Sequence, residues 1–204
     1  MTELLPLLRG RRSIRAYDET HVLSDDELEV LLEAARWSPS AGNSQPWAFL
    51  VGRRGDAAHA TFVELLASSV RRWAPAASAL FFTLNQVASG PEEDALAYSD
   101  YAQYDLGQAV AHLTVQASAL GLGVHQFAAF DHDGLAELAG VPTHWRVTTG
   151  LAVGLAVESE LTPRTRRPLS ELAFGARFGE PIEQWASAGI DLPEGDPNAS
   201  SPPE

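Results

Sequence analysis

Hydrophobic residues recur at helical spacing in two long segments of the chain. The first segment follows Ser24-Asp25-Asp26-Glu27, which has the capping-box form typical of a helix start. The hydrophobic positions after it, which share one helix face, are Leu28, Leu31, Leu32 and Ala35. This helix is expected to end before Pro39, because the residue before a proline avoids helical geometry. The second segment, residues 98–120, carries a hydrophobic stripe and precedes Gly121 at a C-cap position, so it predicts the longest helix.

Shorter hydrophobic runs around these helices predict strands. Large residues alternate in WAFLVG, which begins at Trp47. The other predicted strands are residues 79–84, 123–128 and 147–157. Short helices are predicted at residues 3–8 and 133–139. This order of strands and helices indicates an α/β or α+β domain in which helices pack on a sheet.

The regular pattern ends before the chain does. Beyond Pro163 the chain is rich in arginine, and from Gly179 onward it has little periodicity and ends in GDPNASSPPE. We therefore predict one domain over residues 1–178 and a C-terminal extension over residues 179–204, whose last ten or so residues are expected to be disordered. A chain of 204 residues is long enough for one such domain with its own core.

Composition narrows the class of protein. Hydrophobic residues make up 45% of the chain and charged residues 20%, as in soluble globular proteins. The absence of cysteine excludes disulfides, thiolate metal sites, iron–sulfur clusters and cysteine nucleophiles. In MTELLPLLRGRRSIR a short apolar patch precedes the arginines, the reverse of a secretory signal, so a cytoplasmic protein is expected. The net charge of −13 disfavours binding to nucleic acid or to an anionic membrane.

All 14 basic residues are arginines, and they lie toward the two ends of the chain. Nine lie at or before Arg72 and five at or after Arg146, with dense clusters at residues 11–15 (RRSIR) and 164–167 (RTRR). Guanidinium groups bind phosphate bidentately, so two such clusters that meet in space would form an anion site. The alternative is that the arginines pair at the surface with some of the 27 carboxylates, and charge alone favours this alternative.

Several common site motifs are absent or misplaced. No phosphate-binding P-loop occurs, and Gly121-Leu122-Gly123 follows a predicted helix instead of opening one, which disfavours a Rossmann site. No H-E-x-x-H occurs, and Asp131-His132-Asp133 fits a turn and helix cap better than a metal site. No G-x-S-x-G motif supports a serine hydrolase. We therefore expect neither a metal centre nor a nucleophilic serine.

The loop between the first long helix and the strand at Trp47 has an unusual composition. Pro39, Gly42 and Pro46 meet the need for turn formers. The loop also carries four neutral hydrogen-bonding side chains, which are Ser40, Asn43, Ser44 and Gln45. Such groups suit the edge of a heterocycle or a polyol chain, although a solvated turn explains the loop equally well.

Four segments together resemble the nitroreductase family of FMN-dependent oxidoreductases. They are RRSIRAY at residues 11–17, SPSAGNSQPWAF at 38–49, LGLGVHQFAAFD at 120–131 and TPRTRRPLSEL at 162–172. The resemblance covers about residues 4–172 in the family's order and spacing. It implies an α+β fold with a mixed, mostly antiparallel central sheet flanked by helices. It also implies an intertwined homodimer whose C-terminal segment embraces the partner.

The same resemblance assigns cofactor-binding roles. Arg11 and Ser13, with Arg12 between them, match residues that hold the phosphate and ribityl chain of FMN, and Arg15 matches a cation beside the pyrimidine edge of the flavin. The resemblance also covers three further parts of the family's site. They are a loop that reaches FMN from the other subunit, a strand end near flavin N5, and late arginines at the phosphate. Those residues are Pro39, Ser40, Ala41, Asn43 and Gln45 in the loop, Gln126, Ala128 and Ala129 at the strand end, and Arg164 and Arg166.

The sequence departs from the family pattern at two places. Many members have Asn ahead of an aromatic residue near the flavin pyrimidine, where this chain reads SSVRRW at residues 68–73. Some members have Glu-Gly at the N5 strand end, where Ala128 and Ala129 can offer only main-chain groups.

The activity implied by the resemblance is electron transfer from NADH or NADPH, through flavin N5, to a nitroaromatic, quinone or similar conjugated acceptor by a ping-pong mechanism. No acid or base side chain is required, and Arg15 would stabilise the negative charge that develops on the reduced flavin. A dedicated enzyme of this fold, such as a dehalogenase, azoline oxidase or flavin-fragmenting enzyme, is an alternative. A flavin-binding protein without turnover is another, and an acidic partner protein without a cofactor is a third.

Overall fold

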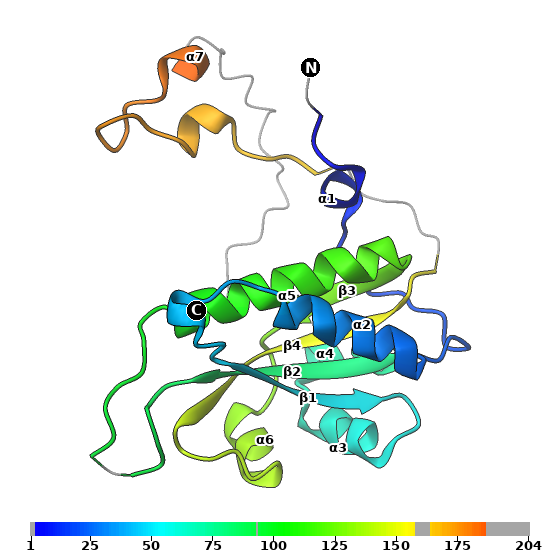
Figure 1. The fold of residues 1–204 in the computed structure, drawn as a ribbon. Coiled ribbons are helices and arrows are strands. Elements are labelled where there is room, and N and C mark those ends of the chain that lie inside the picture. Colours follow the sequence, from blue (N-terminus) through cyan, green and yellow to red (C-terminus); the bar gives the residue numbers. More distant parts are fainter. Residues whose placement is uncertain (1–2, 93, 158–163, 187–204) are drawn as a thin grey trace. The chain divides into compact units, whose positions relative to one another are not determined.

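The chain folds around a four-stranded sheet with the strand order β1-β2-β4-β3 (Figure 1). The computed structural model describes residues 3–92, 94–157 and 164–186. The strands are β1 (Trp47–Arg53), β2 (Ala79–Gln86), β3 (Leu122–Phe127) and β4 (Trp145–Leu155). Every strand pairing within these ranges is antiparallel. The predicted α+β class with a mostly antiparallel sheet is confirmed.

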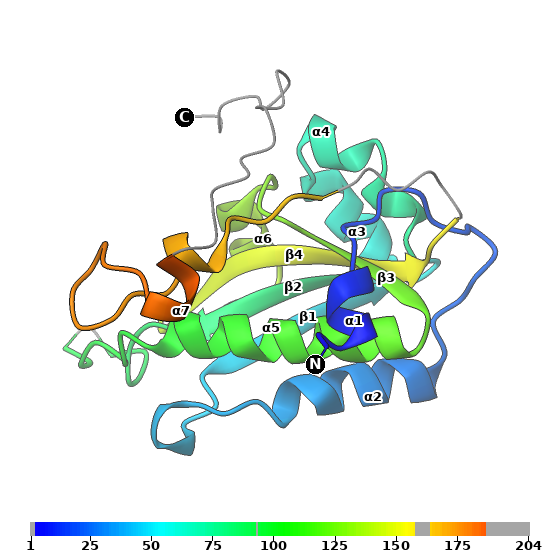
Figure 2. The same ribbon diagram turned by 90° about the horizontal axis from the view of Figure 1, so that it is seen from above.

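Helices cover both faces of this sheet (Figures 1 and 2). On one face lie α2 (Asp25–Arg36) and α5 (Ala102–Ala119). On the other lie α3 (Ala57–Leu65), α4 (Ser68–Arg71) and α6 (His132–Leu138). Because side chains alternate along a strand, Phe81 of β2 packs in the core under α2 and α5, and Phe82 packs in the core under α3 and α6. The sheet therefore separates two hydrophobic cores.

Shorter elements complete the described chain. They are α1 (Pro6–Gly10), α7 (Glu183–Ala186), and the 3-10 turns η1 (Ala41–Asn43), η2 (Ala74–Ala76) and η3 (Leu169–Glu171). The chain divides into two compact units, Met1–Ser159 and Glu160–Glu204. The predicted domain of residues 1–178 covers the first unit and part of the second, and its boundary stays a prediction. The expected disorder of the last ten residues lies outside the described residues.

Most predicted elements occur with small shifts at their ends. Helix α2 begins after Ser24 with both hydrogen bonds of the predicted capping box. Helix α1 begins three residues later and ends two residues later than predicted, with a proline in its first turn. Helix α5 begins at Ala102 and not at residue 98, because the N–H of Tyr98 donates to the carbonyl of Val87 in a separate pairing. Helices α3 and α4 have no counterpart among the predicted elements.

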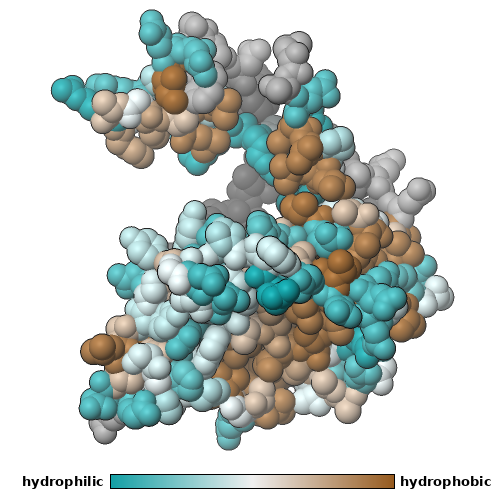
Figure 3. Space-filling view, in the orientation of Figure 1, coloured by the Kyte–Doolittle hydropathy of each residue, from teal (hydrophilic) through white to brown (hydrophobic). Residues whose placement is uncertain are grey.

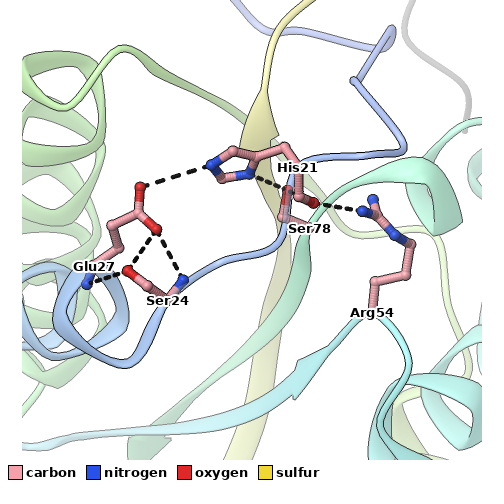
Figure 4. Close-up of polar contacts among 5 residues, drawn as sticks. All are labelled: His21, Ser24, Glu27, Arg54 and Ser78. Carbon is pink, nitrogen blue, oxygen red and sulfur yellow. Dashed lines mark hydrogen bonds and ion pairs between the residues drawn. The ribbon is translucent and has the colours of Figure 1, made fainter.

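A network of polar side chains fastens the segment before α2 to the start of β2 (Figure 4). The His21 Nδ1 atom lies 2.8 Å from Ser78 Oγ, and its Nε2 atom lies 3.7 Å from Glu27 Oε1. Arg54 donates to the carbonyl oxygen of His21. Glu27 also accepts hydrogen bonds from the N–H and the hydroxyl of Ser24, at 2.8 and 2.7 Å. Glu27 therefore both caps α2 and joins it to the sheet through His21.

The stability lost on replacing Glu27 should depend on pH. The backbone hydrogen bond from Ser24 holds the pKa of the Glu27 carboxyl below its ordinary value. The stabilising effect of the ionised carboxylate is therefore present above the ordinary glutamate pKa of about 4.3. It is lost as the pH falls through the lower pKa that Glu27 has in the folded state. We expect Glu27→Ala to lower the free energy of unfolding by about 1–2 kcal/mol at pH 7, and by much less at pH 3.

Urea unfolding at both pH values measures this difference. The control is Glu29→Ala, because Glu29 is exposed on the same helix and its carboxylate has no partner among the described residues. An equal loss for Glu27→Ala at both pH values would contradict the capping role of the ionised carboxylate.

Candidate functional site

A cavity of about 420 Å³ lies where the N-terminal segment, α5 and β3 meet. Three predicted cofactor-binding residues line it, namely Arg11, Ser13 and Gln126. The remaining lining residues are Leu8, Ala111, Thr114 and Val115. The volume is within the range of small-molecule sites, about 300–1,000 Å³. The cavity therefore combines one cation, neutral hydrogen-bonding groups and apolar surface in a space large enough for a cofactor.

Strand alternation directs Gln126 into this cavity. In β3, Val124 packs in the core beneath α5, and Gln126 points to the same face two residues later. His125 and Phe127 point to the opposite face, where Phe127 joins the other core. The position of Gln126 follows from the register of β3, which is set by its pairing with β4.

The segment that carries Arg11 and Ser13 lies against β3. The His125 Nδ1 atom is 3.0 Å from the carbonyl oxygen of Ile14. Burial lowers the pKa of His125 from its ordinary value, so the ring is neutral at pH 7 and Nδ1 donates to this carbonyl. Glycine is needed at position 123, because a Cβ there would lie 2.6 Å from Ile14 Cγ1. These contacts of Ile14 hold the segment against β3 and so position its two cavity residues, Arg11 and Ser13.

Arg15 lies over an aromatic ring and does not line the cavity. Its guanidinium carbon is 5.9 Å from the centre of the Trp73 ring. The Trp73 ring in turn lies 4.4 Å from the ring of His125. Trp73 ends the segment in which the sequence departs from the family pattern. Trp73 therefore contacts both Arg15 and His125, an arrangement that the sequence does not reveal because it joins distant segments.

The backbone that follows β3 is held from two sides. The carbonyl of Ala129 accepts a hydrogen bond of 3.1 Å from the N–H of Ala67. The ring of His132 places Nε2 3.0 Å from the carbonyl oxygen of Ala128 and Nδ1 3.3 Å from that of Val147. Within the described parts of the chain, the N–H of Ala129 donates to no other group. Ala129 is an exposed residue, so this N–H is available to a bound ligand.

The loop of residues 39–45 lies elsewhere on α5. The N–H of Ala41 donates to Asp105 Oδ2, at 3.0 Å, in the first turn of α5. The cavity is lined by Ala111 and by residues beyond it, at least six positions later, which corresponds to about 9 Å along the helix axis. The structure thus brings Arg11, Ser13 and Gln126 together and holds the predicted loop residues apart from them.

Three predicted arginines lie outside the cavity lining. Arg12 donates through Nη1 to the carbonyl oxygen of Arg9, at 3.0 Å, and to the next two carbonyls, and so caps the end of α1. Arg164 and Arg166 are exposed residues of the second unit, where Arg166 Nη1 donates to the carbonyl of Thr165. Their approach to the cavity stays a prediction.

Metal-binding clusters and membrane-spanning helices are both absent from the residues that the structure describes. No group of three or more histidine and acidic side chains is arranged to hold a metal ion within those residues. No helix in the same ranges has the length and apolar character to span a membrane.

The chain is similar to known proteins over most of its length. The family model described as Nitroreductase family matches residues 8–155. An Archaeoglobus fulgidus protein, named as a candidate NADH dehydrogenase/NAD(P)H nitroreductase, is 31% identical over 163 residues, which cover 76% of this chain and 86% of the relative.

Solved structures give the same result. A structure described as an oxidoreductase containing FMN is 30% identical with a TM-score of 0.79, and the match covers 88% of this chain and 94% of the other. A candidate nitroreductase from Desulfovibrio desulfuricans, solved in complex with FMN, is 27% identical with a TM-score of 0.69, and the match covers 87% and 99% of the two chains. This chain therefore belongs to the nitroreductase family.

Proposed function

We propose that this protein is an FMN-dependent oxidoreductase that takes electrons from NADH or NADPH and passes them to a nitroaromatic, quinone or similar conjugated acceptor. The observation that carries the proposal is the cavity lined by Arg11, Ser13 and Gln126, in a chain whose solved relatives contain FMN. When bound, FMN supplies the hydride and electron transfer, and the protein binds it, orients it and adjusts its electronics.

The side chains of the cavity fit the chemical groups of FMN. Arg11 provides a permanent positive charge for the phosphate, with hydrogen bonds stronger than those between neutral groups. The Ser13 hydroxyl and the Gln126 amide can both donate and accept, as ribityl hydroxyls require. Leu8 and Val115 supply apolar surface. A phosphate-bearing polyol with an aromatic ring uses all three kinds of lining group.

Main-chain groups at the end of β3 contact the flavin ring in this proposal. The free N–H of Ala129 donates to the ring, while Ala67 and His132 keep the surrounding backbone in place. Ala128 and Ala129 carry no functional side chain, so this part of the site takes no part in proton transfer. The protein then acts by positioning its substrates and not by acid–base catalysis.

Arg15 gives electrostatic support to flavin reduction. Trp73 and His125 restrict its side chain, and the neutral His125 leaves Arg15 as the cation of this cluster. A fixed positive charge favours the state in which negative charge develops nearby.

A second copy of the chain completes the site in this proposal. Asp105 holds the loop of residues 39–45 about 9 Å or more along α5 from the cavity wall, so Ser40 and Asn43 serve the cavity of a partner subunit. Hydrophobic residues are gathered over α1 (Figure 3). Leu4 and Leu5, directly before this helix, are 54% and 63% exposed. Apolar patches of this kind mark interfaces, which supports a homodimer.

The predicted domain bounds and the late arginines are part of the same proposal. Residues 1–178 form the FMN-binding domain and residues 179–204 a C-terminal extension. Arg164 and Arg166 return to the phosphate, which gives a reason for the arginine clusters at both ends of an acidic chain.

The first test is the cofactor itself. The purified protein should be yellow and contain about one FMN per subunit. Arg11→Ala should raise the dissociation constant of FMN about tenfold or more, because a charged hydrogen bond to the phosphate is lost. Fluorescence titration measures this, with Arg9→Ala as the control because Arg9 is an exposed neighbour outside the cavity lining. Unchanged retention in Arg11→Ala would contradict the phosphate assignment.

Steady-state kinetics should follow a ping-pong pattern. NAD(P)H and the acceptor need close approach to the same reactive atoms of the flavin, so they must use its one open face in turn. Parallel double-reciprocal lines are expected with a quinone or nitroaromatic acceptor. Intersecting lines would indicate two separate sites, and a flavin that anaerobic NAD(P)H fails to bleach would indicate a binding protein without turnover.

Replacing Arg15 should affect reduction more than binding. We expect Arg15→Gln to slow anaerobic flavin reduction by about tenfold, with a smaller change in the FMN dissociation constant, because the charge favours the reduced state in particular. Stopped-flow absorbance and fluorescence titration give the two values. A parental reduction rate would remove Arg15 from the mechanism.

A further inference from the structure

One buried carboxylate connects the two parts of the proposed site. Asp105 is 2% exposed, and its Oδ2 atom accepts the 3.0 Å hydrogen bond from the N–H of Ala41. Its Oδ1 atom lies 3.4 Å from Gln108 Nε2, a long contact within the same helix. Burying a carboxylate costs free energy unless hydrogen bonds compensate for the lost water. The shorter of the two hydrogen bonds of the Asp105 carboxylate is the one from the N–H of Ala41 in the loop.

The loop itself needs a restraint. Gly42, Asn43 and Gln45 have φ values of 59°, 56° and 50°, in the left-handed region that costs free energy for residues other than glycine. One bond inside the loop, from the N–H of Gln45 to Ser40 Oγ at 2.9 Å, helps to close it. Among the described residues, two hydrogen bonds join residues 39–45 to other elements. One is local, from the N–H of Trp47 at the start of β1 to the carbonyl of Gln45, at 2.9 Å. The bond to Asp105 is the one that joins the loop to an element distant in the sequence.

We propose that Asp105 is a positioning residue that fixes the loop of residues 39–45 in the conformation that binds the cofactor of the partner subunit. The proposal rests on the proposed function. Helix α5 lines one cavity through Ala111 and Val115 and, from its first turn, presents Ser40 and Asn43 to the other cavity. Loss of the Asp105 acceptor should therefore release the loop and weaken FMN binding without changing any residue that lines a cavity.

Two substitutions at this position separate hydrogen bonding from packing. Asp105→Asn keeps a carbonyl oxygen for the N–H of Ala41, and the Gln108 amide can rotate to face the new amide group. Asp105→Leu keeps a side chain that branches at Cγ but has no acceptor. Ser118→Ala is the control, because the Ser118 hydroxyl donates to Thr114 within α5 and touches no part of the loop.

The experiment measures two quantities on the full-length protein. Hydrogen exchange followed by mass spectrometry reports the peptide that contains residues 39–45, with and without FMN, and fluorescence titration reports the FMN dissociation constant. For Asp105→Leu we expect loop exchange and the dissociation constant each to rise about tenfold or more, with the dimer retained. Asp105→Asn should stay within about threefold of the parent, and Ser118→Ala should match it.

Specific outcomes would overturn the proposal. Parental loop exchange and FMN affinity in Asp105→Leu would do so, and so would an Asp105→Asn variant as impaired as the leucine variant. A parent that binds no FMN contradicts the proposed function instead, and loop exchange, which needs no FMN, still decides whether Asp105 fixes the loop.

A second variant covers the case in which Asp105→Leu fails to fold. Ala41→Pro removes the same N–H from the loop side. Ser40 already has the extended backbone, φ −149° and ψ 154°, that a residue before proline requires. The expected result is the same rise in loop exchange and in the FMN dissociation constant. Parental values for Ala41→Pro would overturn the proposal.

Discussion

The packing of α5 against the sheet is the constraint on which the site depends. One stripe of this helix is buried, and its members are Ala102, Asp105, Leu106, Ala109, Val110, Leu113, Thr114 and Ala117. Each fully buried leucine or valine contributes about 1.5–3 kcal/mol, so the helix is held firmly in one position and rotation. The cavity wall and the loop anchor lie on this one rigid element. Their separation is therefore fixed, which explains why the loop serves a second chain in the proposed function.

The edge strand β3 distributes the other groups of the site. Its alternation sends Gln126 to the face of α5 and His125 to the opposite face, where the ring of His125 lies against that of Trp73. The N-terminal segment follows this edge because Gly123 leaves room for Ile14. Polar residues thus lie on both sides of one strand, and the backbone that follows the strand offers the N–H of Ala129.

Local signals in the sequence predict the elements better than their ends. The capping box at Ser24 locates the start of α2, since its hydrogen bonds form within four residues. The start of α5 depends instead on the pairing of Tyr98 with Val87, which no local pattern records. Helix α3 also escapes prediction, because its hydrophobic residues are not confined to one helix face.

The residues of the candidate site also differ in whether the sequence predicts them. The resemblance to the family assigns Arg11, Ser13 and Gln126, which the structure places in one cavity. It does not assign Asp105 or Trp73, whose contacts join segments far apart in the sequence. One signal for Asp105 is present, because a carboxylate at this position interrupts the apolar stripe of the long predicted helix.

A site completed across two subunits is tested most directly by a mixed dimer. One subunit would carry Arg11→Ala and the other would carry Ser40→Ala with Asn43→Ala, so that each homodimer has two defective sites. If the loop serves the partner, the mixed dimer has one site with every defect and one site with none. It should then bind one FMN per dimer with the affinity of the parent. Binding as weak as in the two homodimers would show that each chain forms its site alone and would contradict this arrangement.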